Sequence, residues 1–238
     1  MLLGLNACGG DGGDKGIIET VQPAAMEQLM AITFPHWTTF PLDISRNPDG
    51  SEILNIPDPT LGMQRVAIRS RDAEGNITAL DDQGPFRSVI SFLNNRIGMI
   101  CGSDIHFKKG LPGWDLNSGH YLYLSTDFQE VDHRESLGRK YRTYKDCKVD
   151  GLFSIDTAGR SWDMEDLSSP ASDDITPIFA SDGRKVDTGS STATDRAKAY
   201  RLTVNGKDIY AIVGVVAVDP AAPQAEAREQ SVYFAISE

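Results

Sequence analysis

The stretch YRLTVNGKDIYAIVGVVAV, residues 200–218, predicts a β-hairpin more clearly than any other part of the chain. At its centre, Asn205 and Gly206 form the dipeptide that most readily adopts the positive φ angles of a type I′ turn. Tyr200–Val204 and Lys207–Val218 are therefore predicted as paired strands. Ile209–Val218 is apolar almost throughout, which is typical of a central strand covered on both faces.

The same pattern of extended run, turn and extended run recurs outward from this hairpin. Further hairpins are predicted for Leu42–Arg46 with Glu52–Ile56, Gln64–Arg71 with Ile77–Asp81, Lys140–Val149 with Leu152–Asp156 around Asp150-Gly151, and Pro177–Ala180 with Arg184–Thr188 around Asp182-Gly183. Ser231–Ser237 reads as a closing strand. Successive hairpins without α/β alternation predict a mainly β fold, an antiparallel sandwich or barrel with one or two short helices.

Two segments favour helix at least in part. Pro23–Ile32 begins with a proline suited to a first helical turn and continues with good helix formers. Phe86–Asn95 fits a short helix or a bent strand, followed by a strand over Arg96–Cys101. Three polar stretches are predicted as surface loops: Asp163–Asp174, Gly189–Ala197 and Pro220–Gln230.

His120–Ser125 is predicted as a strand whose two faces differ. Tyr121 and Tyr123 lie on one side, and Leu122 and Leu124 on the other. Successive side chains of a strand point to opposite faces, so this alternation indicates two different environments.

Composition places the chain among globular proteins. Hydrophobic residues make up 40% and charged residues 24% of its 238 residues, and we expect residues 19–238 to form a single mainly β domain. The formal net charge of −11 argues against nucleic acid as a partner, because both would carry negative charge. The basic residues clustered between Arg134 and Lys148 are interpreted as charges on the wet face of a strand.

The beginning of the chain carries the only family resemblance. Leu5-Asn6-Ala7-Cys8 follows an apolar start and precedes a Gly/Asp-rich tract. This resembles the lipobox of bacterial lipoproteins, in which the signal peptide is removed and the cysteine is acylated. The resemblance implies that residues 1–7 are a residual signal peptide and that Cys8 is lipidated. Residues 8–18 would then be a flexible tether.

The lipobox implies a bacterial cell-envelope protein, anchored in the outer membrane and facing the periplasm or the surface, whose only membrane contact is the lipid on Cys8. Asn6 is a less usual residue at its position in a lipobox. The alternative is that Met1 is the true start and Cys8 an ordinary thiol. A cysteine within a Gly/Asp tract, however, has no core in which to be buried.

Cys101 and Cys147 form an even pair once Cys8 is set aside. In an exported protein such a pair predicts one disulfide, which would restrain the unfolded chain by about 4 kcal/mol in the entropy model. The alternative is a nucleophilic Cys101, but the residues beside it carry no further catalytic motif.

The candidate site residues are histidines and tryptophans. His106, His120 and His133 would allow a zinc site, although no HExxH or CxxC pair accompanies them. The tryptophans that would suit a ligand are Trp37, Trp114 and Trp162. Acidic turns near Asp49 and Asp72 do not match the ligand spacing of a calcium loop, and we expect no cofactor.

Three classes of function remain open at this point. The preferred one is a non-catalytic lipid-anchored module that binds or assembles with an envelope protein or a glycan. The second is an envelope hydrolase, possibly directed at glycans, with a site built from scattered His and Asp residues. The third is a cytoplasmic protein with an unprocessed Met1, which reduced Cys101 and Cys147 would support.

Overall fold

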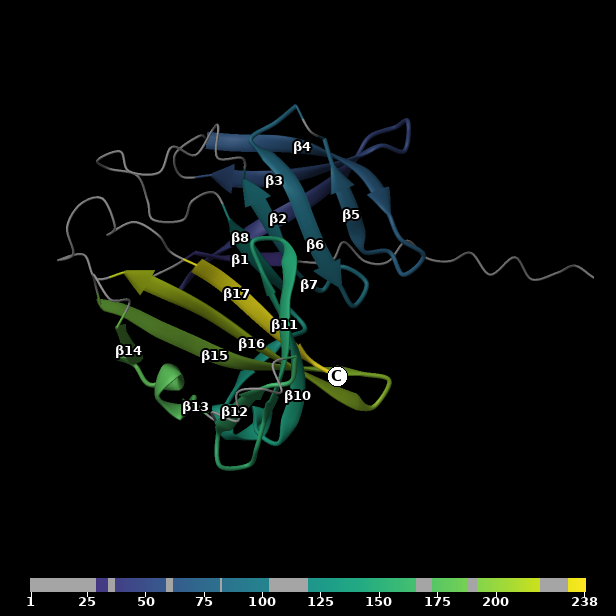
Figure 1. Ribbon diagram of the computed structural model, residues 1–238. Helices are drawn as coiled ribbons and strands as arrows, with labels where there is room; N and C mark the ends of the chain where they lie inside the picture. The colour runs from purple at the N-terminus through teal and green to yellow at the C-terminus, as the bar shows by residue number, and fades with distance from the viewer. Residues whose placement is uncertain are drawn as a thin grey trace, which may run out of the picture.

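The computed structural model describes residues 29–33, 37–58, 62–81, 83–102, 120–165, 173–187, 192–218 and 231–238. These residues form two antiparallel sheets that lie against each other (Figure 1). The prediction of a mainly β antiparallel fold is confirmed. The described residues contain two short helices, and both are 3₁₀ helices.

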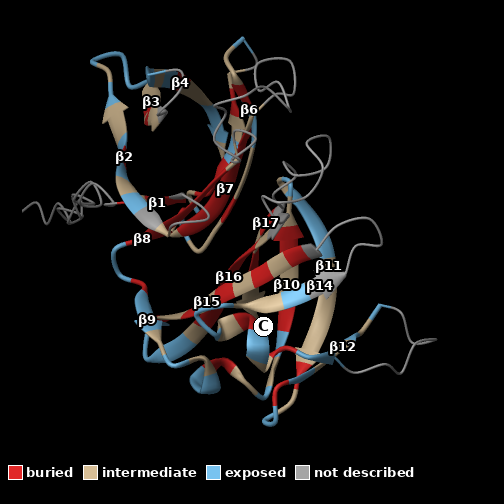
Figure 2. Cartoon of the chain, turned by 90° about the vertical axis from the view of Figure 1, so that its left-hand side faces the viewer, coloured by how far each residue is buried: buried red, intermediate tan, exposed pale blue. Residues whose placement is uncertain are grey.

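The first sheet is nearly closed into a barrel (Figure 2). Its strands are β1 (Leu29–Thr33), β2 (Thr38–Arg46), β3 (Glu52–Asp58), β4 (Gly62–Arg71), β5 (Ile77–Leu80), β6 (Phe86–Phe92), β7 (Ile97–Gly102) and β8 (Tyr121–Ser125), in the order β5-β4-β3-β2-β1-β8-β7-β6. The two end strands approach each other, and the Ser91 hydroxyl donates to the Ile77 carbonyl at 3.1 Å. We call this sheet the barrel.

The second sheet curves into a half-barrel. Its strands are β9 (Gln129–Val131), β10 (Arg139–Lys145), β11 (Lys148–Ile155), β12 (Arg160–Asp163), β13 (Asp173–Asp174), β14 (Arg184–Asp187), β15 (Thr192–Val204), β16 (Lys207–Val218) and β17 (Ser231–Ser237). They follow the order β13-β12-β11-β10-β17-β16-β15-β14, and β9 also pairs with β15. The 3₁₀ helices are η1 (His133–Ser136) and η2 (Thr176–Phe179).

Three hydrophobic cores hold these sheets. One fills the barrel, one fills the half-barrel, and one lies between the two sheets, where β7 and β8 face β16 and β17 (Figure 2). The central strands are therefore buried on both faces, which explains why β16 is apolar almost throughout.

Strand β8 shows the two environments that its sequence predicts. Tyr121 and Tyr123 lie in the core of the barrel, whereas Leu122 and Leu124 lie in the core between the sheets. Each face of β8 thus meets a different core because side chains alternate along a strand.

A disulfide links the two sheets, as predicted from the cysteine pair. Cys101 lies on β7, and Cys147 lies in the turn between β10 and β11, with an S–S distance of 2.07 Å. Beside it, Asp146 Oδ1 lies 3.5 Å from His120 Nδ1, just before β8. The disulfide therefore holds this turn against the barrel, and the close approach of His120 and Asp146 lies beside it.

The hairpin at Asn205-Gly206 is confirmed, with φ angles of 52° and 74° at its two central residues. The hairpins β2–β3 and β4–β5 and the strand β17 also match their predictions. Strand β15, however, begins at Thr192, inside the stretch predicted as a loop over Gly189–Ala197. The prediction is wrong there because these polar residues pair with β14 and β16.

The predicted turn at Asp150-Gly151 is also wrong. The β10–β11 turn lies at Asp146 and Cys147, whose φ angles are 50° and 56°. The register shifts between Thr143 and Tyr144, and Asp150 is the additional residue of the resulting bulge in β11. The Asp-Gly pair therefore marks a bulge, while the disulfide holds the turn four residues earlier.

Three helix-related predictions meet different outcomes. The helix predicted over Pro23–Ile32 is wrong from Leu29 onward, because β1 pairs with β2 and β8, and its first residues lie outside the described chain. For Phe86–Asn95, the strand alternative is confirmed over Phe86–Phe92 and the helix alternative is wrong. Pro177–Ala180, predicted as a strand, lies mostly in η2, where a proline occupies the first turn.

None of the described helices is long and apolar enough to cross a membrane. The predicted loop Pro220–Gln230 lies outside the described residues. The single domain over residues 19–238 stays a prediction.

Candidate functional site

The concave side of the half-barrel holds two adjoining cavities of about 270 Å³ and about 390 Å³. They share four lining residues: Thr143, Asp150, Phe153 and Ser161. We call the two together the half-barrel groove, with an inner cavity of about 270 Å³ and an outer cavity of about 390 Å³. The inner cavity is walled by Phe153, Ile175, Ile178 and Ile212 and has a polar end formed by Arg184, Asp195 and Tyr233.

Strand register places the three polar side chains on one face. Arg184 on β14 is directly opposite Asp195 on β15, and cross-strand partners share a face of the sheet. Two strands further on, the Tyr233 hydroxyl donates to Asp195 Oδ1 at 2.8 Å. Arg184 Nη2 lies 3.5 Å from Asp195 Oδ2, and Arg184 Nη1 donates to the Asp174 carbonyl at 3.4 Å.

Burial raises the pKa values of Asp195 and Tyr233. Asp195 is only 8% exposed, and this burial raises the pKa of its carboxyl above the ordinary value, while the Tyr233 hydrogen bond and the Arg184 charge oppose the shift. The pKa of Tyr233 is raised well above its ordinary value, by burial and then by the neighbouring Asp195 carboxylate. A cavity containing buried titratable groups is the kind of place where ligands bind or reactions occur.

The outer cavity is more polar and more acidic. Asp150, Asp163 and Asp173 are exposed and line it together with Trp162. Trp162 pairs with Ser154 across β12 and β11, one position away from Asp163. Of the three tryptophans predicted as ligand contacts, Trp162 is thus placed at a cavity.

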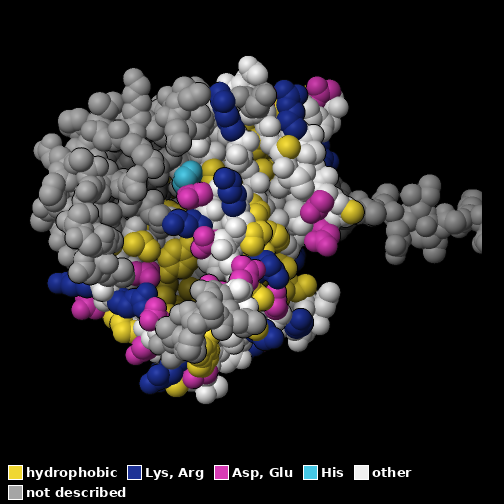
Figure 3. Space-filling view, in the orientation of Figure 1, with side chains coloured by type: hydrophobic (Ala, Val, Ile, Leu, Met, Phe, Trp, Pro, Cys, Tyr) yellow, Lys and Arg dark blue, Asp and Glu magenta, His cyan; other side chains and the backbone are white. Residues whose placement is uncertain are grey.

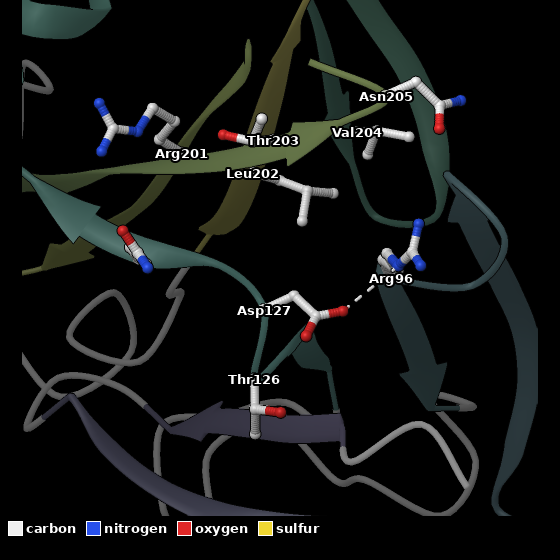
Figure 4. A pocket seen from close by; sticks show the side chains of 9 residues that line it. Arg96, Thr126, Asp127, Arg201, Leu202, Thr203, Val204 and Asn205 are labelled. Atoms are coloured by element: carbon white, nitrogen blue, oxygen red, sulfur yellow. Dashed lines mark ion pairs between the residues drawn. The ribbon is translucent and has the colours of Figure 1, made fainter. Parts of the chain in front are cut away.

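A third cavity, of about 550 Å³, lies where the barrel meets the half-barrel (Figure 4). We call it the junction pocket, and its lining residues are Arg96, Thr126, Asp127, Gln129, Arg201, Leu202, Thr203, Val204 and Asn205. They come from the residue before β7, from the β8–β9 connection and the first residue of β9, and from the end of β15 with the turn that follows it. The pocket therefore has walls from both sheets.

Polar groups dominate the junction pocket. In Figure 4, Asp127 points toward Arg96, and the two charged groups are 3.5 Å apart. Leu202 points into the pocket from β15, while Arg201 extends away from this ion pair and binds Glu135 at 3.0 Å. The Arg96 atom in this ion pair is Nε, which is buried and forms no hydrogen bond with the described residues, Asp127 included. The pocket offers amide, hydroxyl and guanidinium groups for hydrogen bonding.

The two described histidines of the predicted zinc site have different surroundings. His120 pairs with Asp146, whereas His133 stacks on Phe179 with ring centroids 4.9 Å apart. His106 lies outside the described residues. Within the described part of the chain, no group of three or more His, Cys, Asp or Glu side chains is arranged to hold a metal ion.

The other predicted site residues are placed as follows. Trp37 is partly buried, and Lys198 Nζ lies over its ring at 5.4 Å from the centroid. Cys8 and Trp114 lie outside the described residues. The prediction that Cys8 is lipidated stays a prediction.

Charges of both signs are mixed over the visible surface, where lysine and arginine side chains alternate with aspartate and glutamate (Figure 3). In the basic segment, Arg134 pairs with Asp132, Arg142 pairs with Glu238, and Arg139 lies over the Tyr210 ring. The arginines of this segment thus each have a local partner.

Sequence reasoning missed the buried group of the inner cavity. Asp195 falls in a stretch that was predicted as a loop, and Arg184 and Tyr233 are distant from it in sequence. One signal was present: Gly214 interrupts the apolar strand β16, and a glycine within a strand often marks the close approach of another group. Here that group is the ring of Tyr233.

The fold and the cavities define a two-sheet antiparallel β protein with a ligand-sized groove in its half-barrel. The chain matches no protein-family model, no curated protein and no solved structure. Its function is therefore argued from the site itself.

Proposed function

We propose that this protein is a non-catalytic lipoprotein of the bacterial cell envelope, anchored in the outer membrane through acylated Cys8, whose β body binds a partner. The partner is an envelope protein or a glycan, and one of its chemical groups enters a cavity of the folded body. The lipid and the flexible tether would let the folded body reach this partner.

The observation that carries this proposal is the disulfide between Cys101 and Cys147. Disulfides persist in oxidising compartments such as the periplasm and the cell surface, and they are rare in the cytosol. The bond joins the barrel to the half-barrel, so it contributes to the arrangement of the whole described body. An exported protein is the context in which such a bond would form.

The cavities support binding as the role. Ligand sites combine apolar walls with a few convergent polar groups on a rigid scaffold, and the inner cavity has this composition. The lining of the junction pocket provides mainly hydrogen-bonding groups, and its acid is already paired with Arg96. Both cavities are therefore equipped to hold a ligand.

The anchoring is tested in a bacterial host that makes the protein from the gene in its genomic context. We expect mass analysis of the N-terminal peptide to show diacylglycerol on Cys8 and the protein to fractionate with outer membranes. The matched control is Cys8→Ser, which should leave the disulfide intact but remove the diacylglycerol and the protein from the outer-membrane fraction. An unmodified Cys8 in the native protein would refute the anchor.

One observation favours a second candidate, an envelope hydrolase. A buried carboxyl with a raised pKa, as at Asp195, is also how enzymes prepare a general acid. Hydrolysis of cell-wall glycans would have to be lost in Asp195→Asn and kept in Asp43→Asn, whose carboxylate is exposed on the barrel. Equal turnover by both variants would exclude this candidate.

A further inference from the structure

We propose that the inner cavity binds a compact, neutral and mainly apolar group that carries a carbonyl oxygen, and that this oxygen accepts a hydrogen bond from the Arg184 guanidinium. This inference rests on the proposed binding function and names the group of the partner that enters the folded body. It does not depend on the lipid anchor.

The walls of the inner cavity favour an apolar group. Ile175, Ile178 and Ile212 are each less than 10% exposed, and Phe153 lines the cavity with them. Apolar atoms that enter such a space leave water, which favours binding in proportion to the area buried. A volume of about 270 Å³ is at the lower end for ligand pockets, so the group that enters is compact.

Arg184 lines the same cavity and has hydrogen-bond donors to spare. A guanidinium carries five N–H donors. Toward the described residues, Arg184 donates from Nη1 to the Asp174 carbonyl at 3.4 Å and from Nη2 to Asp195 Oδ2 at 3.5 Å, and its Nε is buried without a hydrogen-bond partner. Both contacts are long, and a buried donor without an acceptor is unfavourable. An acceptor in the cavity would therefore be bound by this guanidinium, whose side chain is 31% exposed and within reach.

The groups around Arg184 favour a neutral acceptor over a charged ligand. An ammonium group has donors only and gives Arg184 no acceptor. A carboxylate would accept, but it would bring a second negative charge beside the buried Asp195, and like charges repel. Both oxygens of Asp195 already face donors, Oδ1 the Tyr233 hydroxyl and Oδ2 Arg184. A carbonyl oxygen satisfies the guanidinium without adding charge.

The outer cavity leaves room for the rest of the partner, because it shares four lining residues with the inner one. Trp162 lines it together with polar side chains, and an aromatic ring beside hydrogen-bonding groups suits a sugar. An N-acylated glycan, with its acyl group in the inner cavity, is therefore the favoured source of the carbonyl.

The first test compares three probes with the same six-membered ring: cyclohexanone, cyclohexylammonium and cyclohexanecarboxylate. Each is titrated into the full disulfide-bonded chain at pH 7, and binding is followed by the backbone amide and arginine Nε–H resonances. We expect cyclohexanone to bind tightest and to shift the Arg184 Nε–H and Ile212 amide signals. Tighter binding of a charged probe, or no shift at Arg184, would overturn the proposal.

Two other arginines are internal controls in the same spectra. The Nε atoms of Arg139 and Arg196 are also buried without a hydrogen-bond partner among the described residues, but neither side chain lines a cavity of the groove. Their Nε–H signals should stay unchanged when cyclohexanone binds. Equal shifts at all three arginines would show a general solvent effect and refute this site.

The variants separate the hydrogen bond from the apolar cavity. Arg184→Met removes the donors and should weaken cyclohexanone binding about fivefold, as expected for one hydrogen bond, without weakening the binding of cyclohexane. The matched control Arg196→Met should leave both affinities unchanged. Unchanged cyclohexanone binding in Arg184→Met, or an equal loss in both variants, would refute the role of Arg184. If Arg184→Met does not fold, the Arg184 Nε–H signal of the native protein decides the question.

Two natural probes identify the source of the carbonyl. N-acetylglucosamine carries it on a sugar, and N-acetylleucine amide carries it on a peptide. Displacement of cyclohexanone by N-acetylglucosamine would support the glycan, whereas displacement by N-acetylleucine amide alone would assign the carbonyl to a protein. Displacement by neither would overturn the assignment of this group to an envelope partner.

The result is independent of the membrane anchor. Loss of anchoring in the Cys8 experiment would leave these titrations unchanged, because they use the chain in solution. Failure of cyclohexanone to bind would overturn this ligand group, and the lipid on Cys8 would still be detected if the anchor is real.

Discussion

Tyr233 on β17 covers Gly214, its direct cross-strand partner on β16, so closely that a Cβ atom at Gly214 would overlap the tyrosine ring. The barrel repeats this arrangement, because Tyr123 on β8 covers Gly98 on β7. Each tyrosine hydroxyl then donates to a neighbouring side chain, Tyr233 to Asp195 at 2.8 Å and Tyr123 to Asn95 at 2.7 Å. In both sheets a glycine makes room for an aromatic ring that spans the interior.

Replacement of Gly214 by alanine tests this close approach. The added methyl group must displace the Tyr233 ring, and we expect Gly214→Ala to lower the free energy of unfolding by about 1–3 kcal/mol in urea denaturation. The control is Gly84→Ala, where the nearest atom to a new Cβ is 4.0 Å away. Equal stability of the two variants would contradict the packing described here.

Removal of the Tyr233 hydroxyl tests the polar end of the inner cavity. Tyr233→Phe keeps the ring over Gly214 but removes the hydrogen bond that the hydroxyl donates to Asp195. Of the two partners described at the polar end of the inner cavity, Asp195 then keeps Arg184. A buried acceptor that loses its donor destabilises a protein by about 1–3 kcal/mol, and we expect a loss in that range by urea denaturation. A variant as stable as the native protein would mean that the hydroxyl does not support Asp195.

The disulfide should stabilise the fold substantially. Cys101 and Cys147 are separated by 46 positions, and a closed loop of this size contributes up to about 4 kcal/mol by restraining the unfolded chain. We expect Cys101→Ala with Cys147→Ala to lower the free energy of unfolding toward that amount. Reduction of the native protein should have a similar effect, and an unchanged urea midpoint in both cases would contradict it.

Asp195 should make stability fall as pH rises. Burial raises its pKa in the native state, so the native protein keeps a proton that the unfolded chain releases near its ordinary pKa of about 3.9. The stability of the native protein relative to Asp195→Asn should therefore decrease between about pH 4 and the raised native pKa. Urea denaturation from pH 3.5 to 7 measures this difference, and a relative stability that rises with pH would show that Arg184 dominates.

Glu52 should make stability change with pH in the direction opposite to Asp195. Burial disfavours its charged form, but hydrogen bonds from Arg71 and Arg46 outweigh this and lower its pKa. Its contribution is present above the unfolded pKa and is lost as pH falls through the native pKa. The stability of the native protein relative to Glu52→Gln should therefore increase with pH, and a flat difference would contradict the pairing.

Local signals predicted the parts of the fold that depend on neighbouring residues. Asn205-Gly206 predicted its hairpin because that dipeptide accepts positive φ wherever it occurs. Asp150-Gly151 is an equally local signal, yet it lies in a bulge, because the strands pair in a register that places the turn at Asp146 and Cys147. Leu29–Thr33 contains good helix formers but is a strand, since pairing with β2 and β8 outweighs helix propensity.

The class of fold, most of the hairpins, the two faces of β8 and the cysteine pair could be predicted from the amino acids alone, because turn chemistry and side-chain alternation act over a few residues. The curvature of the two sheets, their shared core and the half-barrel groove could not, because they depend on contacts between distant segments. The groove brings Arg184, Asp195 and Tyr233 together from separate strands, and this depends on long-range register that no local pattern encodes.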